Sequence, residues 1–311
     1  MNDGVQVIVP REVPLGGLRS MTVRRTLPAR ERSFVGAWCF VDHYGPDDVG
    51  VTGGMDVAPH PHCGLATVSW LFTGEVEHRD SLGTVAMVRP GEVNLMTAGR
   101  GISHSEVSTA GTSVLHGAQL WLVLPGASAG VEPRFEHYVP PVLSVAPGVA
   151  ASVFVGSLFG SDSPVLVETP LVGAELVLEP GAVVEVPLAA GFEMAVLVDR
   201  GSVMFEGTEL AWGELGVVEA AGAGDSVRVE AGAGGARVLV LGGEPFGEEV
   251  VMWWNFIGRS HDEVVAAREE WEASGTGRFG QVRGYVGEVS RIPAPGLPGV
   301  RLKSRGNRRH R

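Results

Sequence analysis

Apolar and polar residues alternate through most of this chain, in runs that are each short enough for a single β-strand. Alternate side chains of a strand point to opposite faces, so this period of two favours strands over helices. Turn-forming residues separate the runs, and the chain contains 45 glycines and 20 prolines. Clear examples are TVRRTL (22–27), TVSWLF (67–72), QLWLVL (119–124), EMAVLVD (193–199) and ARVLVLGG (236–243). The pattern predicts an all-β protein.

The length of 311 residues exceeds the usual span of one hydrophobic core, so we expect two domains. A proline-rich, weakly periodic stretch separates two β-rich halves. The expected division is an N-terminal domain at 1–130, a linker at 131–150 and a C-terminal domain at 151–290.

The C-terminal part carries the one convincing helical pattern. A helix is predicted over 260–274, because Ser260 and Glu263 have the spacing of a capping box before an apolar stretch. Further on, RLKSRGNRRHR (301–311) holds six Lys or Arg and no acid, which could contact an anionic partner. No aromatic residue interleaves with these charges, so residues 291–311 are expected to form a disordered basic tail.

Composition excludes several classes of protein. Cys39 and Cys63 are too few for a disulfide framework, and no basic and apolar leader is seen, which favours a reducing cytoplasm. No apolar run approaches the ~20 residues that a membrane helix needs. A net charge of −12 argues against general affinity for nucleic acid. We therefore expect a soluble, cytoplasmic monomer that binds neither membrane nor nucleic acid directly.

Two pairs of potential ligands in the first half share one spacing. APHPHCGLA contains His60 and His62, and TAGRGISHSEVS contains His104 and Glu106. If both stretches are strands, the two members of each pair lie on one face, and neighbouring strands would bring three imidazoles and one carboxylate together. This donor set suits Fe, Ni, Cu, Zn or Mn. Four ligands in an octahedral sphere leave two positions open, as a catalytic metal requires.

These residues also have structural interpretations that involve no metal. Two histidines that are two residues apart, taken by themselves, are more often polar surface residues of a strand than metal ligands. Cys63 alternates to the face opposite His62, which favours a buried apolar role. In EHRDSLG, we expect Asp80 to accept from backbone amides of a turn and Arg79 to pair with a carboxylate, with a direct catalytic part for His78 as the minor alternative. His43 and His116 have no spaced partner and are expected to be structural.

The sequence that surrounds these histidines resembles that of a known protein family. HPHCGLATVSWLFTGEVEHRDSLG followed by RPGEVNLMTAGRGISHSE resembles the N-terminal motif block of the pirins, which are cupin proteins. VRRTLPARERSFVGAWCFVDHYGP resembles their opening strands, and GGEPFGEEVVMWWNFIGRSHDEVVAAREEWEASGTGRFG resembles their closing segment and helix. The resemblance covers most of residues 18–280.

The resemblance implies two jelly-roll β-barrels of the cupin type, of which only the N-terminal barrel holds a metal. The pirin ligands fall on His60, His62, His104 and Glu106. The metal would be iron, with Ni, Mn, Cu, Co or Zn as alternatives. No histidine lies between His137 and His261, which agrees with a metal-free second barrel. The wider cupin pattern expects a Glu soon after the histidine pair; this chain has Ala66 and Thr67 there, and Glu106 replaces it, as in pirins. Many pirins carry charged or larger residues where this chain has Cys63, Leu65 and Ala66, so substrate preferences need not carry over.

Three functions follow from the resemblance. The first is a quercetinase-type 2,3-dioxygenase, which opens a flavonol ring with dioxygen and releases carbon monoxide, with Glu106 taking the hydroxyl proton as the catalytic base. The second is a metal- or redox-dependent regulator that binds a partner protein, either as a transcriptional cofactor or as a modulator of a metabolic enzyme. The third, a metal that merely stabilises the fold, ranks last, because open coordination positions suit a structural site poorly.

Overall fold

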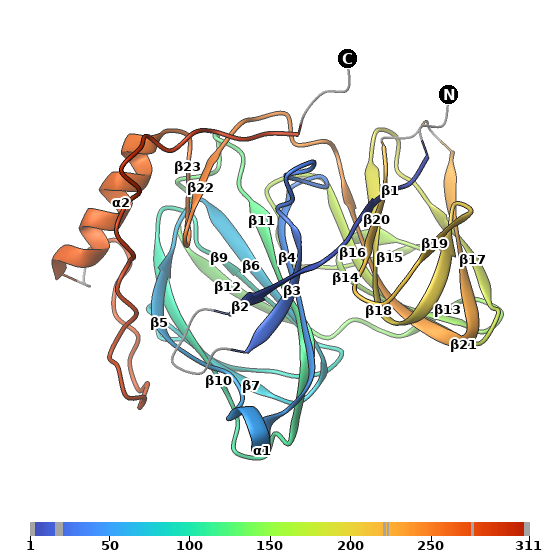
Figure 1. Ribbon diagram of the computed structural model, residues 1–311, viewed down its shortest axis with the longest axis horizontal. Helices are drawn as coiled ribbons and strands as arrows, with labels where there is room; N and C mark the ends of the chain where they lie inside the picture. The colour runs from blue at the N-terminus through green and yellow to red at the C-terminus, as the bar shows by residue number, and fades with distance from the viewer. Residues whose placement is uncertain (1–3, 16–20, 220–221, 223, 275–276, 308–311) are drawn as a thin grey trace. The chain divides into compact units, whose positions relative to one another are not determined.

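The structure of the protein is a computed structural model, which describes residues 4–15, 21–219, 222, 224–274 and 277–307. The described chain is mostly β-strand, as predicted (Figure 1). It forms two compact units that interleave along the sequence. Unit 1 comprises Met1–Glu12, Arg24–His43 and Tyr138–Phe246, and unit 2 comprises Val13–Val23, Tyr44–His137 and Gly247–Arg311. The boundaries at 130 and 151 proposed from the sequence stay a prediction.

Unit 1 is built on one large antiparallel sheet. Its main path runs β1 (Gln6–Ile8), β20 (Leu215–Val218), β18 (Glu193–Phe205), β21 (Ser226–Gly243), β16 (Leu171–Leu178), β14 (Val149–Leu158) and β13 (Leu143–Ala146). Off this path, β15 (Ser161–Asp162) pairs with β14, β17 (Val183–Pro187) with β21, and β19 (Thr208–Leu210) with β18. Alternate residues of the strands point inward, which produces one aliphatic core. This core includes Val153, Leu176, Val196, Phe205 and Val238.

The two predicted ligand pairs lie on a four-stranded sheet of unit 2. This sheet has the order β5 (Asp56–His62), β10 (Ile102–Ser108), β7 (Val76–Asp80) and β8 (Val85–Val88). A seven-stranded sheet has the order β12 (Arg134–Tyr138), β9 (Val93–Thr97), β6 (Leu65–Thr73), β11 (Val114–Val123), β4 (Trp38–Asp48), β3 (Thr22–Leu27) and β2 (Arg11–Pro14). A single helical turn, α1 (Val49–Thr52), follows β4 and is capped by the Asp48 carboxylate.

A hairpin and one helix follow on unit 2. β22 (Val251–Trp253) pairs with β23 (Phe256–Gly258), and α2 (His261–Ser274) packs beside them (Figure 1). The predicted helix is confirmed, and Ser260 caps it as predicted, because the Glu263 amide donates to Ser260 Oγ over 3.2 Å. The Glu263 carboxylate accepts from the Arg259 amide at 2.8 Å. The apolar side of α2 packs Trp271 into a cluster with Phe256. No helix in the described part of the chain is long and apolar enough to cross a membrane.

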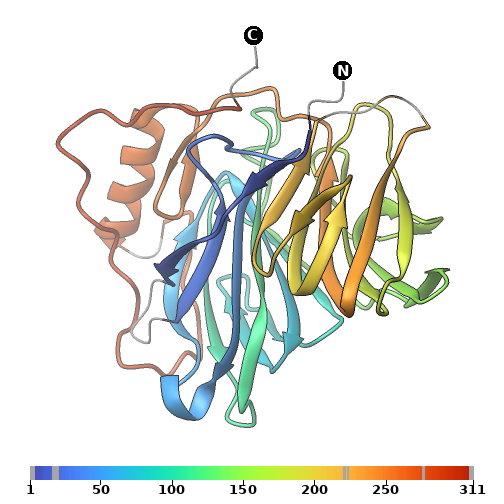
Figure 2. The same cartoon turned by 45° about the vertical axis from the view of Figure 1, so that its right-hand side comes forward.

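The basic C-terminal segment makes defined contacts within unit 2 as far as residue 307. It runs past α2, as Figure 2 shows, and the Ile292 amide donates to the Pro59 carbonyl over 2.8 Å. Arg301 pairs with Asp262 at 2.9 Å, and Arg305 exchanges two backbone hydrogen bonds with Val250. The sequence shows the charges of this segment but not the acidic and backbone groups that it contacts. For this reason the sequence pattern predicts a disordered tail here. Residues 308–311 lie outside the described residues.

Candidate metal centre

The two ligand pairs predicted from the sequence lie on neighbouring strands. His60 and His62 are on β5, and His104 and Glu106 are on β10. The antiparallel register places His104 opposite His60. It then shifts by one residue before Glu106, which pairs with Val57. Such irregularities re-aim side chains and are common beside functional sites.

The three imidazoles form a compact, buried cluster. Their ring centroids are 4.9 Å apart for His60 and His62, 4.3 Å for His60 and His104, and 4.9 Å for His62 and His104. The Nε2 atoms of His62 and His104 face each other at 3.1 Å. One ligand atom from each of the three rings lies within 4.8 Å of the others. Strand geometry alone therefore brings these three side chains together as expected.

Glu106 lies in a second group that shares His104 with the first. One ligand atom each from His78, His104 and Glu106 lies within 4.8 Å of the others. The Glu106 carboxylate accepts a hydrogen bond from Ser69 Oγ at 3.3 Å, and the same hydroxyl contacts Gln119 Oε1 at 3.0 Å. The donors thus form two overlapping triads, which meet at His104.

Burial controls the electrostatics of the cluster. It lowers the pKa of His60 to about 4 and holds the pKa values of His62 and His104 well below the ordinary value. The three rings are therefore neutral at physiological pH, which is the form that binds metals. Burial also raises the pKa of the Glu106 carboxyl, against the opposing influence of His78 and Ser69. A cation beside the Glu106 carboxyl group would favour its charged form.

The hydrogen bonds of the cluster agree with a metal ion among the imidazoles. His60 Nδ1 lies 2.9 Å from the Ala58 carbonyl, which accepts but cannot donate, so this nitrogen carries the proton and Nε2 keeps its lone pair. Metal-binding histidines are typically held by such a hydrogen bond from the other ring nitrogen to a carbonyl or carboxylate. Three neutral imidazoles with a carboxylate nearby are a donor set that fits a divalent first-row metal.

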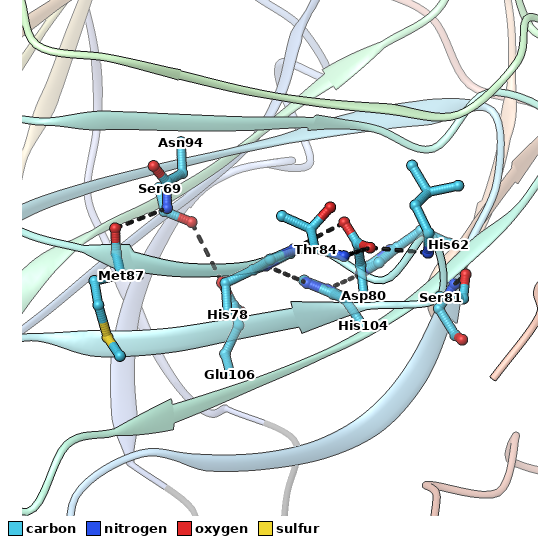
Figure 3. Close-up of polar contacts among 12 residues, drawn as sticks. His62, Ser69, His78, Asp80, Ser81, Thr84, Met87, Asn94, His104 and Glu106 are labelled. Carbon is cyan, nitrogen blue, oxygen red and sulfur yellow. Dashed lines mark hydrogen bonds and ion pairs between the residues drawn. The ribbon is translucent and has the colours of Figure 1, made fainter. Parts of the chain in front are cut away.

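His78 and Asp80 on β7 complete the polar surroundings of His104 (Figure 3). His78 Nδ1 lies 3.3 Å from His104 Nδ1, and His78 Nε2 lies 3.3 Å from Asp80 Oδ2. Asp80 Oδ1 accepts from the amides of Leu82 and Thr84, at 2.9 and 3.0 Å, as predicted for a turn. Arg79 pairs with Glu77, also as predicted. The place of His78 beside His104 was not visible in the sequence, because 26 residues separate them.

Cys63 and His43 are buried and have partners or packing neighbours in the structure. Cys63 is buried in the apolar cluster that holds Phe256 and Trp271, which confirms its assignment as a small apolar residue. His43 is fully buried in unit 1, where its Nε2 lies 2.7 Å from Asp199 Oδ1. This is the satisfied structural histidine that the sequence indicates.

Known proteins resemble this chain over nearly all its length. The pirin family model matches residues 20–122, and the model of the pirin C-terminal cupin domain matches residues 173–280. A protein of Pseudomonas aeruginosa that is named provisionally as a quercetin 2,3-dioxygenase is 40% identical over 94% of this chain and 91% of its own length. A pirin-like protein of Caulobacter vibrioides is 37% identical over 82% of this chain and 90% of its own.

Solved structures agree with these relatives. A crystal structure described as quercetin 2,3-dioxygenase from Acinetobacter baumannii matches with a TM-score of 0.88 and 38% identity, over 98% of both chains. A bacterial pirin from Escherichia coli, solved in complex with nickel(II), shares the fold with a TM-score of 0.60 and 20% identity, over 78% of this chain and 100% of its own. The expected architecture of two cupin domains is therefore confirmed, and the chain belongs to the pirin family.

Proposed function

We propose that this protein is a metal-dependent dioxygenase that opens flavonol-like phenolic rings at a centre formed by His60, His62, His104 and Glu106. The buried cluster of three neutral imidazoles beside a carboxylate is the observation that carries this proposal. The Pseudomonas and Acinetobacter relatives, at 40% and 38% identity, carry the name of this activity. Residues 138–260 contain no histidine, which supports placing the reaction in the N-terminal cupin domain alone.

Iron is the metal we propose, held by the Nε2 atoms of the three histidines and by Glu106. When bound, such a metal supplies a Lewis acid with coordination positions left open for oxygen atoms. His60 and Glu106 are 6% and 7% exposed, whereas His62 and His104 are each 1% exposed. His60 and Glu106 thus offer slightly more accessible surface than the other two donors.

Glu106 is the residue placed to move a proton. Its burial raises its pKa, which makes its carboxylate a stronger base than an exposed one. Ser69 Oγ donates to one carboxylate oxygen at 3.3 Å and so orients the group. In this proposal, Glu106 takes the proton of the phenolic hydroxyl, which leaves an electron-rich ring for dioxygen to attack.

Two aromatic side chains near the histidines favour a flat, aromatic guest. The Trp121 ring lies edge-on to His62 at 5.1 Å, and the Phe135 ring stacks on His78 at 4.7 Å. Aromatic rings prefer such edge-on or offset stacked neighbours.

Oxygen uptake by the metal-loaded protein tests the function. The protein is loaded anaerobically with Fe(II), Ni(II) or Mn(II) and is then mixed with a panel of flavonols, while oxygen consumption and released carbon monoxide are measured. We expect uptake with at least one metal and a 3-hydroxyflavone, and none in His60→Ala. The absence of turnover with every metal and phenolic in the panel would overturn the enzymatic function and favour the partner-binding regulator.

A further inference from the structure

A line of four buried polar side chains leads from a turn to the histidine cluster. Asp80, His78, His104 and His62 follow one another with nitrogen and oxygen contacts of 3.3, 3.3 and 3.1 Å (Figure 3). All four are at most 3% exposed, so water does not compete for these contacts. The β7 and β10 strands impose this order, because their register pairs His104 with Asp80 and Glu106 with His78.

With both imidazoles taken as neutral, proton counting along this line has one solution. The ionised Asp80 carboxylate only accepts, so the proton of His78 must sit on Nε2. A neutral His78 then has a bare Nδ1, which can only accept, and the contact at 3.3 Å obliges His104 to carry its proton on Nδ1. A neutral His104 is left with a bare Nε2, and this is the atom that faces the cluster.

We propose that His78 and Asp80 are positioning residues, which hold His104 in the tautomer whose Nε2 lone pair is directed at the metal. This inference rests on the metal centre proposed above and adds two residues to it. The amides of Leu82 and Thr84 fix the carboxylate of Asp80, and the stacked ring of Phe135 fixes the plane of His78. The pair performs for His104 what the Ala58 carbonyl performs for His60.

The same atoms allow one competing assignment. His78, His104 and Glu106 are themselves close enough to hold an ion. In that assignment His78 is a ligand through Nδ1, and His104 must turn its Nδ1 lone pair toward the ion instead of donating a proton. The two assignments therefore predict opposite protonated nitrogens on His104, which is measurable.

The Asp80→Asn variant is the sharpest test. An asparagine keeps the volume and one oxygen for the turn amides, but it presents NH2 where Asp80 presents Oδ2. His78 would then accept at Nε2 and carry its proton on Nδ1, and His104 would receive that proton and carry its own on Nε2, where it blocks the metal. We expect zinc affinity, measured by competition with a chromogenic chelator, to fall ~10- to 100-fold. The matched control is Glu77→Gln on the same strand, whose carboxylate pairs with Arg79 and which should bind zinc like the wild type.

A pair of substitutions at His78 separates positioning from packing. His78→Phe keeps a ring against Phe135 but removes the acceptor, so zinc affinity should fall as in Asp80→Asn. His78→Asn places an oxygen near the position of Nδ1 and should recover most of the lost affinity. A purely structural role predicts the reverse order, because phenylalanine preserves the packing better than asparagine.

Nitrogen NMR of the metal-free protein gives a readout that does not depend on metal binding. With 15N-labelled histidine, the signals of His104 are assigned by their loss in His104→Gln. We expect the proton of His104 on Nδ1 in the wild type and on Nε2 in Asp80→Asn. Zinc binding by Asp80→Asn within two-fold of the wild type, or a wild-type His104 protonated on Nε2, would overturn the inference. A wild type that binds no zinc but shows the Nδ1 proton would instead contradict the metal centre and leave the positioning intact.

Discussion

Acid should unfold the metal-free protein by way of the buried imidazoles. The pKa of His60 is about 4 in the folded protein, against an ordinary value of 6.5, because burial disfavours the charged ring. Below pH 6.5 the unfolded chain thus binds a proton that the folded protein does not. Stability is complete above this pH and is lost as the pH falls toward 4. The loss from His60 alone is ~2 kcal/mol at pH 5. His62 and His104 add losses of the same sign, because their pKa values are also lowered.

Urea unfolding of the metal-stripped protein at pH 7.5 and 5.0 measures this loss. His60→Asn is the comparison, because it removes one buried titrating ring while the carboxylates remain common to both proteins. We expect the unfolding free energy of the wild type to fall by ~2 kcal/mol more than that of the variant over this range. Saturating zinc should raise the unfolding free energy at both pH values without reducing the loss, because the metal binds only neutral rings and so lowers their pKa in the folded protein further. An equal pH dependence of the two proteins would refute the reasoning.

Three further predictions concern single side chains. Glu106→Gln should lower flavonol turnover at least ~100-fold in oxygen-uptake assays, because the amide cannot take the hydroxyl proton, and unchanged turnover would exclude Glu106 as the base. Neither cysteine should react with a thiol reagent at pH 8 until the protein is denatured, because both are buried and burial raises the pKa of Cys63 to about 11. Rapid labelling of the native protein would show that the cysteines are accessible. Arg32→Met should cost ~3–5 kcal/mol in unfolding experiments, because it leaves the buried Glu193 carboxylate without its charged partner at 2.8 Å. The surface change Arg228→Met should cost less than ~1 kcal/mol, and equal losses for the two variants would contradict the distinction.

Local patterns were sufficient to predict much of this protein. The alternation of apolar and polar residues predicted the strands, and the spacing of Ser260 and Glu263 predicted the start of α2. The clustering of His60 and His62 followed from strand geometry, because residues two apart share a face.

Features that depend on pairing between strands far apart in the sequence could not be predicted from local patterns. The nearness of His78 to His104 comes from the register of β7 and β10, which no local pattern specifies. The register shift between β5 and β10 that lies between His104 and Glu106 has the same origin. The contact of Ile292 with Pro59 is also non-local, because the two residues are far apart in the sequence. Pro59 lies on β5, which pairs with β10 along one edge and whose prolines offer no N–H.

Anomalous X-ray diffraction from a zinc-loaded crystal would test the central claim most directly. If His60, His62 and His104 hold the metal, the map will show one strong peak per chain at ~2.0–2.1 Å from the Nε2 atoms of these three residues. A peak bonded to Nδ1 of His78, or no peak at any of these side chains, would contradict the account.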